Sequence, residues 1–190
     1  MNKTITVNVI HLLELGARCY VFLMINVYAW GKLMGGQFYR KGKLPAEVAT
    51  QTLGEVNSFD LAWTFMGHSY FYILFIGIAQ LTGSWMLLWH RTKLIGAFIL
   101  LPILINIVVF DVIFLDRLGA LASAGLYLVL TLTILLINYK QVYSAVYQLI
   151  GPKPEHDKTL FNKWIQIILV LVLVLILFGV DQFLVNLFGH

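Results

Sequence analysis

The chain has 190 residues, of which 60% are hydrophobic and 12% are charged, and its mean hydropathy is +0.85. A soluble domain is about 25% charged, and a surface with so little charge would leave apolar patches that aggregate in water. The composition therefore excludes a soluble globule, a disordered chain and a fibre, and it predicts an all-α, multi-pass integral membrane protein. The net charge of +4 is attributed to the span ends rather than to a nucleic-acid surface.

Runs without Asp, Glu, Lys or Arg predict five membrane spans, because a bilayer core of about 30 Å needs about 20 apolar residues per helix. The first and weakest run predicts a span at about residues 17–36. Residues 1–16 are interpreted as a cytoplasmic helix leading into it, since no signal-peptide pattern is present. The other four spans are predicted at residues 61–90, 94–115, 118–139 and 164–190.

The only long loop between predicted spans covers about residues 36–60. Pro45 before Ala46–Ala49 predicts a short helix with proline at its start, and Gly54 suits the end of that helix. Ser58 with Asp60 is a predicted N-terminal cap for the second span.

The remaining connections define the predicted domain organisation. The turns at residues 90–93 and 116–117 are short, which predicts antiparallel neighbouring helices. An antiparallel four-helix transmembrane domain is therefore expected over residues 1–140. Residues 141–163 are expected to form an interfacial helix and a polar linker with two prolines, and residues 164–190 an appended fifth span.

Lysine and arginine decide the expected orientation in the membrane. Eight of these residues fall on the side of the N-terminus: Lys3, Arg18, Arg91, Lys93, Lys140, Lys153, Lys158 and Lys163. Five fall on the other side: Lys32, Arg40, Lys41, Lys43 and Arg117. The count favours a cytoplasmic N-terminus and a periplasmic C-terminus in a bacterial inner membrane.

Several kinds of chemistry lack the residues that they require. One cysteine, Cys19, excludes an internal disulfide and a thiolate metal cluster. The two histidines on spans, His68 and His90, belong to one predicted helix and would lie about 33 Å apart, too far to ligate one haem. No metal site and no intrinsic cofactor are therefore expected.

Ionisable groups inside an apolar span suggest a functional site. Asp111 lies 18 residues after Lys93, about 27 Å along the third span, and Asp181 reaches a similar depth on the fifth. We expect a polar cluster at the outer surface with these members: Lys32, His68, Asp111, Arg117 and Asp181. Pairing of Asp111 with Lys32 or Arg117 would offset the cost of burial. The alternative is a set of separate interface charges that reach water.

Two amides, Gln80 and Asn106, fall near the middle of the membrane in the predicted spans. They could hydrogen-bond to each other across the helices, or they could line a pocket for a quinone or a lipid head group. Asn106 and Asp111 are about 140° apart around their helix and are not expected to share one pocket wall. Glu14 and Arg18, at positions i and i+4, are expected to form an ion pair.

Degenerate motifs in the first three predicted spans occur together. The first span has Arg18 and ends in Gly31-Lys32, and the second has the pattern Gly77-x-x-Gln80-x-x-Gly83. The third contains the sequence Pro102-x-x-x-Asn106. In combination, these residues resemble the DoxX-like family of small membrane proteins over about residues 15–140.

The resemblance implies a four-helix unit, to which the fifth span is an addition. The family includes a subunit of a thiosulfate:quinone oxidoreductase, subunits of other membrane oxidoreductases, and relatives with chaperone-like or assembly roles. This chain departs from the family pattern with Gln80 in place of a glutamate and Asp111 in place of a histidine. The missing titratable group and the missing cysteine pair argue against carrying over a redox activity.

Three functions follow as expectations. The first is an accessory or assembly subunit of a bacterial inner-membrane complex, respiratory or redox-linked, without complete catalytic machinery and with membrane-protein partners. The second is a quinone-reactive oxidoreductase subunit in which Asp111 or His68 handles protons. The third is a small lipid-binding or transport protein.

Overall fold

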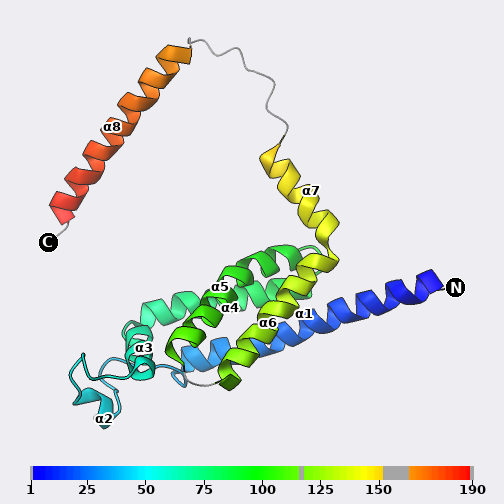
Figure 1. Cartoon of the computed structure of the whole chain (residues 1–190), viewed down its shortest axis with the longest axis horizontal. Helices are drawn as coiled ribbons and strands as arrows, with labels where there is room; N and C mark the ends of the chain where they lie inside the picture. Colours follow the sequence, from blue (N-terminus) through cyan, green and yellow to red (C-terminus); the bar gives the residue numbers. More distant parts are fainter. Residues whose placement is uncertain (1, 116–117, 152–162, 189–190) are drawn as a thin grey trace. The chain divides into compact units, whose positions relative to one another are not determined.

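The computed structural model describes residues 2–115, 118–151 and 163–188, and all regular structure in these ranges is helical (Figure 1). The helices are α1 (Asn2–Met34), α2 (Ala46–Ala49), α3 (Ser58–Gly67), α4 (Tyr70–Leu88), α5 (Lys93–Phe114), α6 (Leu118–Ile137), α7 (Tyr139–Ile150) and α8 (Lys163–Phe188). The chain divides into two compact units, residues 1–145 and 146–190. Each unit is described by itself.

Five helices are long and apolar enough to cross a membrane, which confirms the predicted class of multi-pass membrane protein. They cover these ranges: Val9–Met34, Tyr70–Leu88, Lys93–Phe114, Leu118–Ile137 and Trp164–Phe183. The first span begins earlier than the predicted residue 17, because α1 continues as one helix from Asn2 through the whole segment. The short helix after Pro45 is also present as α2, but it ends at Ala49 rather than at Gly54.

The predicted second span, residues 61–90, is wrong as a single helix, since the chain breaks between α3 and α4 at His68 and Ser69. A continuous helix of that length would extend about 45 Å, well beyond a bilayer core of about 30 Å. The Ser69 hydroxyl accepts a hydrogen bond from the Tyr72 N–H and caps the new helix. At the other end, Asn57 rather than Ser58 caps α3, because its side chain accepts from the Asp60 N–H.

The first unit contains an antiparallel ring in which α1 and α5 each pack against both α4 and α6. Glycines allow α4 and α5 to approach closely: a Cβ at Gly96 would lie 2.6 Å from the Gly83 carbonyl oxygen. The buried core of the ring includes these apolar side chains: Val21, Ile25, Leu87, Leu100, Leu104 and Ile134. This ring positions the polar side chains described below.

The second unit contains the end of α7 and the whole of α8. Gly151, with a φ of +57°, ends α7, and its N–H donates to the Tyr147 carbonyl. The side chains of α8 from Ile167 to Leu177 are Leu, Val and Ile and are exposed, as in a helix that faces lipid. Most of the predicted proline-containing linker lies outside the described residues.

Candidate functional site

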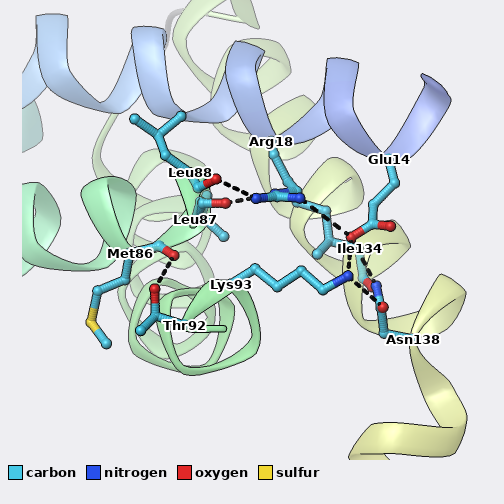
Figure 2. Close-up of polar contacts among 9 residues, drawn as sticks. All are labelled: Glu14, Arg18, Met86, Leu87, Leu88, Thr92, Lys93, Ile134 and Asn138. Atoms are coloured by element: carbon cyan, nitrogen blue, oxygen red, sulfur yellow. Dashed lines mark hydrogen bonds and ion pairs between the residues drawn. The ribbon is translucent and has the colours of Figure 1, made fainter. Parts of the chain in front are cut away.

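The first unit holds two clusters of buried polar side chains, one near each end of the helix ring. The first cluster joins α1, α5 and the junction of α6 with α7 (Figure 2). Lys93 Nζ donates to Glu14 Oε1 at 2.6 Å and to Asn138 Oδ1 at 2.7 Å, although the lysine is only 2% exposed. Asn138 Nδ2 also donates to Glu14 Oε1, at 3.2 Å. The charges of Glu14 and Lys93 are thus paired and hydrogen-bonded where they are buried.

Arg18 belongs to the same cluster and closes the end of α4. Its Nε donates to the Leu87 carbonyl at 2.6 Å, and its Nη2 donates to the Leu88 carbonyl at 2.5 Å. These carbonyls lie in the last turn of α4, where helical acceptors need outside partners. The predicted Glu14–Arg18 ion pair is present at 3.9 Å, but it is the longer of the two contacts that Glu14 makes with a cation. These contacts tie α1 to the end of α4, to α5 and to the start of α7, so the cluster is a structural clamp.

The second cluster, at the other end of α1, consists of Lys32, Gln80 and Asp111, and all three are buried. Lys32 Nζ donates to Gln80 Oε1 at 2.9 Å. Asp111 attracts Lys32 electrostatically, but the ion pairs of the described residues all involve Glu14. Gln80 is 1% exposed, and its Nε2 has no hydrogen-bond partner among the residues that the structure describes. This cluster therefore has one unused donor and two opposite charges that do not touch.

Two cavities flank the second cluster, and both are lined by Lys32, Gln37, Trp63, Ile107 and Asp111. The first, which we call the α4–α5 cavity, has a volume of about 410 Å³. Its further lining residues are Phe38, Met66, Tyr72, Phe75, Ile76, Ala79, Pro102, Ile103, Asn106 and Phe110. It is mostly apolar, with the charges at one end.

The second cavity, which we call the aromatic cavity, has a volume of about 260 Å³ and includes Gln80 in its lining. Its aromatic walls come from Tyr28, Phe59, Trp63 and Tyr127. Two small side chains of α6, Ser123 and Ala124, also line this cavity. Gln80, whose amide Nε2 is unpartnered among the described residues, thus lines a space with aromatic walls.

The break before α4 places α3 at these cavities. Trp63 of α3 stacks on Phe59 with 4.2 Å between ring centroids, and it contacts Phe38 edge-on at 5.4 Å. Gly67 permits this position, because a Cβ there would lie 1.9 Å from the Tyr39 carbonyl oxygen. Trp63 lines both cavities, and its role as a shared wall depends on the break.

The structure brings together some of the predicted site residues and separates others. Lys32, Gln80 and Asp111 form the second cluster. Asn106 lines the α4–α5 cavity together with Asp111, so the expectation that these two would not share a wall is wrong. The reason is that a cavity running along α5 has a wall wide enough to include both positions. The expected Gln80–Asn106 hydrogen bond is also wrong, because Gln80 Oε1 accepts from Lys32 and its Nε2 is unpartnered.

Three predicted residues are not part of the site as described. His68 is exposed where α3 ends and lines neither cavity, so its expected place in the cluster is wrong. Arg117 lies outside the described residues. Asp181 is an exposed residue of α8, in the second unit.

Comparisons with known proteins find a relative in Bacillus subtilis. The chain is 36% identical over 96 residues to YwoB of Bacillus subtilis (strain 168), described as an uncharacterized protein. The matched region covers 50% of this chain and 58% of the length of YwoB. No model of a protein family matches the chain, and no solved structure matches it. The relationship to DoxX-like proteins therefore stays a prediction.

Proposed function

We propose that the protein binds an amphipathic small molecule at the Lys32 end of its helix ring. The polar group of this ligand lies at Lys32, Gln80 and Asp111, and its apolar part occupies the α4–α5 cavity. The observation that carries the proposal is the Gln80 Nε2 group, which is buried beside the aromatic cavity without a partner. An unsatisfied buried donor costs about 1–3 kcal/mol, and a ligand oxygen would remove that cost.

The charges beside Gln80 support the same ligand. Lys32 can donate to a ligand oxygen while it keeps its bond to Gln80, because an ammonium has three donors. Asp111 can accept from a hydroxyl or an amine. The two charges compensate each other, which favours, at this cluster, a part of the ligand that is neutral or carries both donors and acceptors.

The shape of the α4–α5 cavity supports an apolar tail. Two of its lining side chains, Tyr72 and Phe75, are also exposed at the surface of the ring, and Phe75 is 71% exposed. The cavity is thus open between α4 and α5, on a surface that faces lipid in a membrane protein. A hydrocarbon chain can enter from the bilayer without crossing water.

A quinone is the second candidate, and the aromatic cavity is the observation that favours it. A quinone ring fits between the side chains of Tyr28, Phe59, Trp63 and Tyr127. Its carbonyl oxygens would accept from Gln80 and Lys32. With electrons supplied by a partner redox subunit, protonated Asp111 would donate a proton to the quinone as it is reduced and would take one back on reoxidation. Loss of quinone reduction in Asp111→Asn, with unchanged turnover in Asp181→Asn, would support an oxidoreductase subunit.

The ligand proposal is tested by extraction of the purified protein. Wild type isolated in a mild detergent is expected to retain a small molecule that organic extraction and mass spectrometry identify at a fixed ratio to protein. Gln80→Leu is expected to lower this ratio, whereas Gln141→Leu, at an exposed position on α7, is the matched control. Extracts of wild type that contain only the bulk lipids of the membrane, in bulk proportions, would overturn the proposal.

We also propose that the protein is a DoxX-like accessory or assembly subunit of a bacterial inner-membrane complex, respiratory or redox-linked, with a cytoplasmic N-terminus and a periplasmic C-terminus. The support is the combination of motifs in residues 15–140, the distribution of lysine and arginine, and the additional apolar helix α8. Purification from native membranes without crosslinking is expected to recover partner subunits. A homogeneous preparation of this chain alone would contradict the role.

A further inference from the structure

A third cavity lies where the loop after α1 passes α3, and we call it the Arg40 pocket. It has a volume of about 420 Å³ and is lined largely by polar atoms. Its lining residues are Met34, Gly35, Gly36, Gln37, Phe38, Tyr39, Arg40, Lys43, Pro45 and Trp63. They include two cations and no acid, so the pocket is complementary to an anion.

The guanidinium of Arg40 is held in place before any ligand arrives. Its Nη2 donates to the Leu33 carbonyl at 2.8 Å, at the end of α1. The guanidinium carbon also lies 5.0 Å from the centre of the Tyr70 ring. Gly35 makes room for it, since a Cβ there would lie 3.0 Å from Arg40 Nε, and its φ of +89° also favours glycine. A fixed guanidinium loses little freedom on binding.

Arg40 also has unused donor capacity. Its Nε is buried and, within the described part of the chain, has no hydrogen-bond partner. A guanidinium presents its donors in one plane, in a geometry that matches two oxygens of a phosphate group. Lys43, which is exposed on the same lining, supplies a second positive charge. A phosphate, with several oxygens and a negative charge, is an anion that this pair of side chains can bind.

The Arg40 pocket is continuous in its lining with the α4–α5 cavity, because Gln37, Phe38 and Trp63 line both. A polar, positively charged space therefore adjoins an apolar one that opens toward lipid. A molecule with a phosphate at one end and a hydrocarbon chain at the other matches a charged pocket that adjoins an apolar cavity.

We propose that the Arg40 pocket binds the phosphate of an anionic phospholipid, and that one acyl chain of this lipid lies in the α4–α5 cavity. The proposal rests on the proposed function and names the class of its amphipathic ligand. The ester carbonyls of the lipid, which lie between phosphate and chain, are acceptors for Lys32, which lines the α4–α5 cavity.

The test measures lipid binding to the full-length protein by native mass spectrometry. Phosphatidylglycerol is expected to bind more tightly than phosphatidylcholine with the same chains, because the choline cation opposes Arg40 and Lys43. Lys43→Gln and Arg40→Lys are each expected to weaken phosphatidylglycerol binding about tenfold, the effect of losing one charge-assisted hydrogen bond. Lys43→Gln keeps the test informative if changes at Arg40 disturb the end of α1.

Lys41→Gln is the matched control, since it removes the same charge from the same loop at an exposed residue outside the pocket lining. Equal losses in Lys41→Gln and Lys43→Gln would overturn the pocket and indicate a general surface charge effect. Displacement of the lipid by millimolar inorganic phosphate would overturn the lipid assignment in favour of a free-phosphate site.

The two proposals fail in different ways. Suppose that Lys43→Gln binds an amphipathic ligand as tightly as wild type does, and that ligands with a phosphate are not preferred. In that case only the assignment to a phospholipid fails. If wild type retains no ligand, and Gln80→Leu is identical to wild type in every lipid assay, the proposed function fails with it.

Discussion

Lys93 Nζ on α5 lies 2.6 Å from Glu14 Oε1 on α1, and the same two helices carry the opposite arrangement of charge at their other ends. Lys32 follows Glu14 by eighteen residues, and Asp111 follows Lys93 by eighteen residues. Eighteen residues are about five helical turns, so each helix presents both of its charges on one face. The two ends differ in their surroundings: at one end Lys93 donates to both Glu14 and Asn138, and at the other Lys32 and Asp111 line two cavities.

The Glu14–Lys93 pair is expected to contribute strongly to stability. Lys93→Met leaves the Glu14 carboxylate buried with only Asn138 and a distant Arg18, and removal of one partner of a buried pair costs about 3–5 kcal/mol. The thermal unfolding midpoint in detergent should fall sharply. The double variant Glu14→Gln with Lys93→Met should recover most of the lost stability. Equal stability of Lys93→Met and the double variant would contradict a stabilising Glu14–Lys93 pair.

Arg18 is expected to hold the end of α4 through geometry rather than charge alone. Arg18→Lys keeps the charge but cannot serve the Leu87 and Leu88 carbonyls with two donors in the same plane. We expect a loss of about 1–3 kcal/mol and faster hydrogen exchange in the last turn of α4. Arg91→Lys, at an exposed position, is the control. Unchanged exchange in Arg18→Lys would show that the carbonyls do not depend on this side chain.

The α4–α5 cavity can be closed without touching a charged residue. Ala79→Phe adds a ring inside the cavity lining. It is expected to lower the amount of bound ligand to about a tenth or less. The reason is that a hydrocarbon chain excluded from the cavity loses about 0.8 kcal/mol of binding free energy per CH₂ that is no longer buried. Ala122→Phe adds the same ring at an exposed position of α6. Retention of the ligand is measured by mass spectrometry after detergent washing. Equal retention in both variants would place the ligand elsewhere.

Gly67 is expected to be essential for the position of α3. In Gly67→Ala, the added Cβ would meet the Tyr39 backbone, which has to move, and overpacking of this kind costs about 1–3 kcal/mol. Trypsin cleavage after Arg40, Lys41 and Lys43 should become faster, since the loop loses its contact with α3. Gly119→Ala has open space around the new Cβ and is the control. Cleavage at the wild-type rate in Gly67→Ala would contradict this packing.

The distribution of polar residues made part of the candidate site predictable. Lys32, Gln80 and Asp111 are polar interruptions of apolar spans, and the cost of burying them alone indicates partners. Their depth follows from helical rise, so Lys32 and Asp111 could be assigned to the same level by counting residues. The absence of His68 from the cluster could not be predicted in this way, because it depends on the bend at Ser69.

Glu14 with Lys93 shows why other contacts could not be predicted. Both residues lie at predicted span ends, where a charge normally reaches water, and no local pattern connects positions 79 residues apart. Their pairing depends on which faces of α1 and α5 turn toward the centre of the ring. The place of Trp63 was not predictable for a related reason: an aromatic residue near a span end looks the same in the sequence whether it faces lipid or covers a cavity.

The sequence by itself determined the class of protein, the number of apolar helices and most of their ends, because these depend on hydrophobicity, which each segment carries locally. Only the tertiary structure decided that the second predicted span divides into α3 and α4, that α3 covers the cavities, and that Gln80 has an amide without a partner. Each of these depends on a close approach between distant segments, such as Gly67 with Tyr39 and Gly83 with Gly96. Steric fit between backbones is a property of the packed ring, and no single segment contains it.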